Sequence, residues 1–260
     1  MAAPSFKEMT GNVVAAILTT WRPCQPLLLA AVVGSLVVTG VVGILAPGDV
    51  GQAFAGLPLM VLTLAVSAGV AGYIVSGDGA FTTLGGVMRH PLSYRFVLRY
   101  LLLSIALSVP VILMVPVLTS AAAGDGLGAP AAITALLLLS VLLFLAARLA
   151  VFPYGAFLDP PVSLQDAFLM TQGHALKIIG CVLIFAVGIL AALGALTAVA
   201  RLVVDGIAGA TGLGGGAAAI MAMQSVGQIV AAYAIDCLYG TITRMLAAPS
   251  SQPPQLEADD

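Results

Sequence analysis

The sequence predicts an all-α fold, a polytopic membrane protein with six transmembrane helices, and three observations support this prediction. Hydrophobic residues fill 61% of the 260 positions and charged residues only 8%, whereas soluble domains carry about 25% charged residues. Six apolar stretches each reach the ~20 helical residues that a bilayer core of about 30 Å requires. Segments that contain Gly, Pro and Asp separate these stretches, as expected of loops between helices.

The apolar stretches define the spans and the organisation of the chain. The predicted spans are residues 26–46, 53–75, 96–118, 131–152, 178–200 and 217–239. The alternating pattern of a membrane β-barrel is missing, so the expected spanning elements are helices. The sequence therefore predicts an amphipathic N-terminal segment (1–24), a six-helix transmembrane domain (25–246) and a disordered acidic C-terminal tail (247–260).

The basic residues predict the orientation, because Lys and Arg accumulate on the cytoplasmic side of membrane proteins. With the N-terminus inside, only Arg201 lies on the outer side. The cytoplasmic set comprises Lys7, Arg22, Arg89, Arg95, Arg99, Arg148, Lys177 and Arg244. We therefore expect both termini in the cytoplasm.

Three segments outside the spans predict short amphipathic helices on the inner surface: residues 5–21, about 80–89 and about 163–173. In the first, apolar residues recur at three- and four-residue spacing, which places them on one helix face: Phe6, Met9, Val13, Val14, Ile17, Leu18 and Trp21. Ser5 with Glu8, and more weakly Ser163 with Asp166, predict capping boxes. Each segment precedes two spans, which predicts three hairpins. The three surface segments share similar residues, which fits a threefold repeat. The alternative is that short polar linkers in any apolar chain tend to contain Gly, Thr and Asp.

Asp236 is the one acid placed well inside a predicted span. Ser225, Gln228 and Asp236 share one face of the last span, which predicts a polar stripe that faces protein rather than lipid. A buried acid in a membrane requires a partner, and Arg148, at similar depth on the fourth span, is the expected one. The pattern favours a structural ion pair or an interhelical hydrogen-bond cluster. A proton- or ion-responsive site is the alternative.

The densest group of basic residues is Arg89, His90, Arg95 and Arg99. We interpret it as the positive anchor of the third span. The alternative is a set of contacts to anionic lipid headgroups, where each surface cation contributes about 1 kcal/mol.

Motifs of catalysis and of cofactor or metal binding are missing from the sequence. The two histidines lie in different loops, and the three cysteines lack metal-ligand spacing. The Gly-rich residues 212–216 have no following Gly-Lys-Ser/Thr, so they do not predict a phosphate loop. Without a basic run, the sequence does not predict nucleic-acid binding. We therefore expect no catalytic residue and no cofactor.

The stretch from Arg148 to His174 has the most distinctive pattern of the chain. It contains Arg148, Pro153, Ser163-Leu-Gln-Asp-Ala-Phe168 and Thr171-Gln-Gly-His174. It resembles a segment of bacterial multi-pass proteins related to the membrane domain of glycerophosphodiester phosphodiesterases, with Phe168 in the place of a Trp. The resemblance implies a bacterial inner (cytoplasmic) membrane. It does not imply hydrolysis, because the catalytic barrel of those enzymes is a separate domain that this chain does not contain.

These observations favour a non-catalytic integral membrane protein that acts as an interaction, assembly or accessory subunit of a membrane complex. The expected partners are the lipid bilayer and either another membrane protein or further copies of this chain. The alternative is a small-molecule or lipid transporter, or a lipid-handling protein, with a cavity near Asp236 and Arg148.

Overall fold

The computed structural model describes residues 4–45, 49–122, 128–211 and 216–247, and within these ranges it is helical and contains no strand. The long helices are α1 (Phe6–Leu45), α2 (Asp49–Ser76), α4 (Pro91–Ala122), α5 (Gly128–Leu149), α8 (Ala175–Thr211) and α9 (Gly216–Ala247). The short ones are η1 (Gly79–Thr82), α3 (Leu84–Arg89), α6 (Val151–Tyr154), η2 (Gly155–Phe157) and α7 (Leu164–Met170). Apart from Ala247, the predicted acidic tail lies outside the described residues.

Six helices are long and apolar enough to cross a membrane, which confirms the predicted all-α, multi-pass class. The candidate spans are Phe6–Val42, Ala55–Ser76, Pro91–Ile112, Leu137–Phe157, Ala175–Val199 and Met223–Ala247. Each one overlaps a stretch that the sequence predicts.

The first helix differs from the prediction of a surface helix followed by a separate span. α1 continues without a break through Pro23 and Pro26. The physical reason is its buried face, which recurs every three or four residues along most of the helix and so favours one continuous element. That face includes Met9, Val13, Thr20, Cys24, Leu27, Ala31, Ser35 and Thr39. Of the predicted N-terminal apolar face, Phe6, Val14, Leu18 and Trp21 remain exposed.

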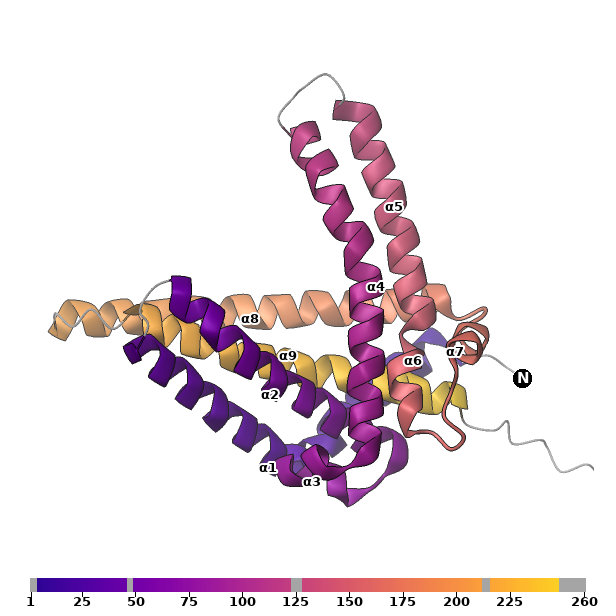
Figure 1. The fold of residues 1–260 in the computed structure, drawn as a ribbon, viewed down its shortest axis with the longest axis horizontal. Helices are drawn as coiled ribbons and strands as arrows, with labels where there is room; N and C mark the ends of the chain where they lie inside the picture. The colour runs from indigo at the N-terminus through magenta and orange to yellow at the C-terminus, as the bar shows by residue number, and fades with distance from the viewer. Residues whose placement is uncertain (1–3, 46–48, 123–127, 212–215, 248–260) are drawn as a thin grey trace, which may run out of the picture.

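The helices form two parts that diverge from each other (Figure 1). α1, α2, α8 and α9 lie together, and α9 packs against each of the other three. α4 and α5 pack side by side and project away from these four helices. We call these two helices the α4–α5 arm. Past Phe96, no described residue of α4 is buried, and the first buried residue of α5 is Leu142.

An aromatic cluster joins the base of the arm to the rest of the fold. Phe96 of α4 stacks on Phe157 of η2 with ring centroids 5.4 Å apart, and Phe81 of η1 meets the edge of Phe157 at 5.2 Å. Phe81 also fills the space above Gly72 of α2, where an added Cβ would lie only 2.6 Å from the ring. This close approach of η1 to α2 requires glycine. The cluster thereby fixes where the arm leaves the bundle.

Candidate functional site

Asp236 lies at the centre of the fold, where α9 meets the base of the α4–α5 arm. Its side chain is 1% exposed, and Oδ1 accepts a hydrogen bond of 2.7 Å from the hydroxyl of Tyr154. Tyr154 is also buried and comes from α6, the short helix that follows α5. The acid therefore connects the last long helix to the element that ends the arm.

Further polar side chains surround this pair. The Ser67 hydroxyl of α2 faces the carboxyl group, and the phenols of Tyr100 (α4) and Tyr239 (α9) lie close enough to interact with its charge. The rings of Tyr154 and Tyr239 are 5.6 Å apart. Oδ2 of Asp236 has no hydrogen-bond partner of normal geometry among the described residues. Four helices therefore converge on one carboxyl group.

The predicted pair of Asp236 with Arg148 is not formed. The Arg148 side chain points to α7 instead, where Nη2 donates to the carbonyl of Phe168 at 2.6 Å and the guanidinium lies 3.8 Å from the centre of the Phe168 ring. Thr171 completes this contact by donating its hydroxyl to the Arg148 carbonyl at 2.8 Å. In the described part of the chain, the one contact within 4 Å between a basic side-chain nitrogen and a carboxylate oxygen joins His90 to Asp78. The positions of Arg148 and Asp236 in their spans predict a similar depth in the membrane, but they do not reveal that Tyr154 reaches Asp236.

The predicted polar stripe of the last span is correct for Ser225 and Asp236 but wrong for Gln228. Ser225 is buried beside Thr39 of α1, with the two hydroxyl oxygens 3.4 Å apart. Gln228 is exposed. The buried face of α9 passes through Ser225, Ile229 and Asp236. Gln228 lies on the flank of this face, because each residue turns the helix by about 100°.

Of the four residues in the predicted basic cluster, Arg89 and Arg95 are exposed, whereas His90 and Arg99 form contacts within the protein. Arg89 and Arg95 are exposed, as a headgroup contact requires. Nη1 of Arg99 donates to the carbonyl of Val162 at 2.8 Å and to that of Phe152 at 3.2 Å, and its guanidinium lies over the Phe152 ring. Arg99 therefore connects α4 to α6 and to the segment before α7, and its guanidinium is engaged within the protein.

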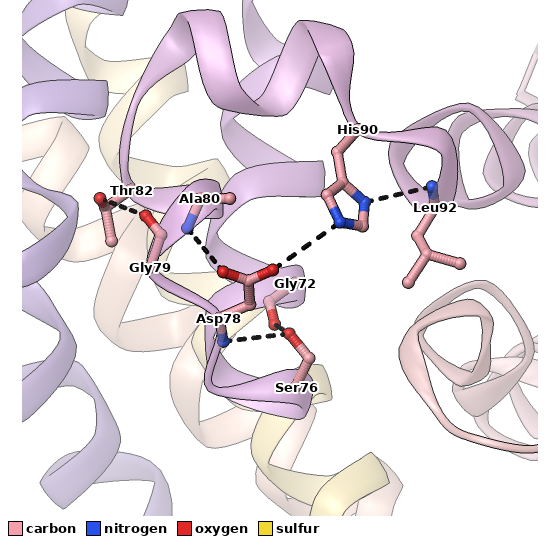
Figure 2. Close-up of polar contacts among 8 residues, drawn as sticks. All are labelled: Gly72, Ser76, Asp78, Gly79, Ala80, Thr82, His90 and Leu92. Carbon is pink, nitrogen blue, oxygen red and sulfur yellow. Dashed lines mark hydrogen bonds and ion pairs between the residues drawn. The ribbon is translucent and has the colours of Figure 1, made fainter.

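His90 has a structural role in the connection from α2 to α4 (Figure 2). Its Nε2 lies 3.7 Å from Oδ2 of Asp78, and its Nδ1 accepts from the backbone N–H of Leu92 at 3.3 Å. Oδ1 of Asp78 accepts from the N–H of Ala80 at 2.8 Å, so Asp78 caps η1. His90 thus caps the start of α4 while Asp78 holds the other side of its ring.

The connection from α6 to α8 contains the second predicted capping box, and the structure confirms it. Ser163 Oγ accepts from the N–H of Asp166 at 3.1 Å, and Asp166 Oδ2 accepts from the N–H of Ser163 at 3.2 Å. The Ser163 hydrogen bonds hold the pKa of the Asp166 carboxyl below its usual value. Desolvation, followed by the nearby charge of Lys177, lowers the pKa of His174.

The chemistry that this arrangement offers is limited. Within the described residues, no group of three or more His, Cys, Asp and Glu side chains could hold a metal ion. Cys24, Cys181 and Cys237 are buried free thiols. The distinctive group is the buried Asp236 carboxyl, which accepts one phenol hydrogen bond on Oδ1 and has no hydrogen-bond partner on Oδ2 among the described residues. Sequence reasoning missed Tyr154, because the short helix α6 that positions it follows directly on α5.

The chain was compared with known protein families, with curated proteins and with solved structures. The resemblance of the Arg148–His174 stretch to the membrane domain of glycerophosphodiester phosphodiesterases stays a prediction. No protein family, no curated protein and no solved structure matches the chain.

Proposed function

We propose that this chain is a non-catalytic membrane protein of the bacterial inner membrane that acts as an assembly or accessory subunit of a membrane complex. In the proposed arrangement, three helical hairpins cross the membrane, amphipathic surface segments precede them, and both termini are cytoplasmic. The observation that supports the proposal is the α4–α5 arm, which leaves the other helices of its own chain (Figure 1); no described residue of α4 beyond Phe96 and none of α5 before Leu142 is buried.

The α4 span is the least buried of the six candidate spans. Of its most apolar part 6% is buried, compared with 11% in the α8 span, 39% in the α5 span and 50% in the α2 and α9 spans. Lipid can cover an apolar helix, but small residues that recur at four-residue spacing favour contact with another helix. Ser104 and Ser108 have this spacing on exposed α4. Val111 and Val115 extend the same face and are about half exposed. We therefore propose that a transmembrane helix of another protein packs on this face.

A photocrosslinking experiment in native membranes tests the proposal. We expect a photoreactive residue at Val111 to form an adduct with a second, distinct protein. The control position is Leu29 of α1, which is 55% exposed and lies outside the arm, so it should crosslink to lipid alone. Replacing both Ser104 and Ser108 with Leu should abolish the adduct at Val111, because bulky side chains prevent close helix contact.

Two outcomes would contradict this proposal. Lipid adducts alone at Val111 would show that the arm faces the bilayer. An adduct between two copies of this chain would replace the accessory role with homo-oligomerisation.

The alternative predicted from the sequence, a transporter or lipid-handling protein with a cavity near Asp236 and Arg148, has less support. A hollow of about 520 Å³ adjoins the Arg148 side, with Leu149 and Phe168 in its wall. Asp236 does not line this hollow. A single transport site would have to include both residues.

A further inference from the structure

His90 is the residue at which α3 ends and α4 begins (Figure 2). Its backbone N–H donates to the carbonyls of Gly86 and Val87, which ends α3. Its own carbonyl accepts from the N–H of Ser93 at 3.1 Å, in the first turn of α4. One residue therefore connects the two helices at the point from which the α4–α5 arm departs, which we call the α3–α4 joint.

The imidazole ring of His90 provides the acceptor for the first N–H of α4. The helix begins at Pro91, which has no backbone N–H, so the first N–H belongs to Leu92. N–H groups in the first turn of a helix lack a helical partner. Nδ1 of His90 accepts from Leu92 at 3.3 Å (Figure 2). The ring thus has the role of the side-chain oxygen of an N-cap residue.

The contacts of the ring define its tautomer. A neutral imidazole has one nitrogen that donates and one that accepts. Because Nδ1 accepts from Leu92, the proton of the neutral ring lies on Nε2, which is 3.7 Å from Oδ2 of Asp78. Phe81 packs against the ring with centroids 4.4 Å apart and limits its reorientation. The neutral ring therefore caps α4 only as the Nε2–H tautomer.

Water can reach this ring. The neighbouring candidate spans end at Ser76 and begin at Pro91, so His90 lies in the connection between them, and its side chain is 24% exposed. Histidine is the side chain that typically changes its charge between about pH 5 and 8. Both nitrogens of a protonated imidazole donate. When a proton from water binds to Nδ1, this atom can no longer accept from Leu92.

The elements around the ring carry few charged or titratable side chains. The helices that pack against η1 and α3 are α1, α2 and α4. The groups at this end of the fold are Arg22 and Cys24 on α1, Tyr73 on α2, Asp78 before η1, Arg89 on α3, and Tyr94 and Arg95 on α4. Among the described residues, Asp78 is the one carboxylate within 4 Å of the ring, and its side chain is 49% exposed. An ion pair at such an exposed site contributes little, so it does not replace the lost cap.

We propose that proton uptake by His90 releases the first turn of α4 and makes the α3–α4 joint sensitive to pH. The neutral ring caps α4, whereas the protonated ring keeps only its contact with Asp78. The proposal concerns the joint itself, so it does not depend on whether another protein binds the arm.

Nuclear magnetic resonance of the full, nitrogen-15-labelled chain in detergent micelles tests the proposal. The chain has two histidines, and His174→Gln identifies the ring signals of His90. We expect the nitrogen shifts of the neutral ring to show the Nε2–H tautomer. As the pH falls from about 8 to about 5, the protection of the Leu92 amide, corrected for its intrinsic exchange rate, should drop about fivefold, which corresponds to the loss of a typical N-cap.

Three variants separate the cap from other effects of pH. His90→Asn keeps a side-chain acceptor that does not titrate, so the protection of the Leu92 amide should be the same at both pH values. Asp78→Asn removes the charge beside the ring but leaves Nδ1 in place, so the drop in protection should persist. His174→Gln removes the other histidine and should leave the drop unchanged.

Three results would overturn the proposal. The first is an Nδ1–H tautomer of the neutral ring, because that nitrogen could not accept from Leu92. The second is equal protection of the Leu92 amide at both pH values in the unmodified chain. The third is loss of the pH dependence in Asp78→Asn, which would assign the effect to the ion pair rather than to the cap.

Discussion

At the residue scale, the structure shows how the membrane-embedded part of the protein accommodates a buried acid without a cation. Tyr154 donates to Asp236 from a helix that is one turn long. Ser67 and two further tyrosines complete the polar surroundings. A neutral donor avoids the desolvation of a second charge, which is costly in a low-dielectric interior. Arg148 does not pair with Asp236 and instead donates a hydrogen bond to the carbonyl of Phe168 in α7.

The hydrogen bond between Tyr154 and Asp236 predicts a measurable coupling. In a double-mutant cycle of Tyr154→Phe and Asp236→Ala, we expect a coupling free energy of about 0.5–1.5 kcal/mol, within the range that such cycles give for hydrogen bonds between membrane helices. The free energy of unfolding is measured in mixed detergent micelles. The control cycle pairs Asp236→Ala with Tyr239→Phe, because Tyr154 rather than Tyr239 donates to Oδ1 of the acid and Oδ2 has no hydrogen-bond partner among the described residues; the coupling of this control cycle should be smaller. Equal couplings would contradict the assignment of Tyr154 as the specific donor.

At the element scale, side chains that reach backbone carbonyls hold the connections between helices. Arg99 crosses from α4 to the carbonyls of Phe152 and Val162, and Arg148 crosses from α5 to the carbonyl of Phe168. Carbonyls in short helices and in the connections between them lack helical partners, so an arginine with several donors can satisfy them. Basic residues that lie near membrane boundaries therefore contribute to internal structure as well as to orientation.

Arg99→Gln tests this structural role. We expect it to lower the free energy of unfolding by about 1–3 kcal/mol, since the carbonyls of Phe152 and Val162 lose a charged hydrogen-bond donor. Arg95→Gln is the matched control, because Arg95 is exposed one turn away on the same helix; it should change stability by less than about 0.5 kcal/mol. If the two variants lower the free energy of unfolding equally, the structural role of Arg99 is contradicted, and Arg99 is then a surface anchor like Arg95.

At the scale of the whole molecule, polar contacts between helices gather at one end of the protein, whereas the α4–α5 arm exposes apolar side chains. The start of α1 and the end of α9 lie together, as the contact between Asn12 and Met245 shows. Lys177 at the start of α8 donates to the carbonyl of Pro4 at 2.8 Å. The α4–α5 arm diverges from this shared end (Figure 1). One end of the protein is therefore well packed and polar, whereas the arm exposes apolar surface.

The proposed orientation can be tested by cysteine labelling. A membrane-impermeant maleimide should label Gln172→Cys, which is exposed between α7 and α8, only after the cells are permeabilised. Arg201→Cys, exposed just beyond the α8 span, should be labelled in intact cells. The three native cysteines are buried and provide a low background. The opposite labelling pattern would place the termini outside.

The sequence alone determined the all-α class, the number of spans and their approximate positions, because apolar length is a local property that the bilayer imposes. It also located both capping boxes, Ser5 with Glu8 and Ser163 with Asp166, since the partners are three residues apart. Asp236 stood out as a buried acid for the same local reason.

Only the tertiary structure decided which groups meet. The Tyr154–Asp236 hydrogen bond, the turn of Arg148 toward α7 and the exposure of Gln228 depend on how separate helices are rotated and packed. The continuity of α1 through two prolines depends on the partners along its buried face. A hollow of about 540 Å³ between α1, α2 and α9 likewise combines residues from both ends of the chain, such as Asn12 and Arg244. Such contacts follow from helix packing, which residue spacing within a single helix does not specify.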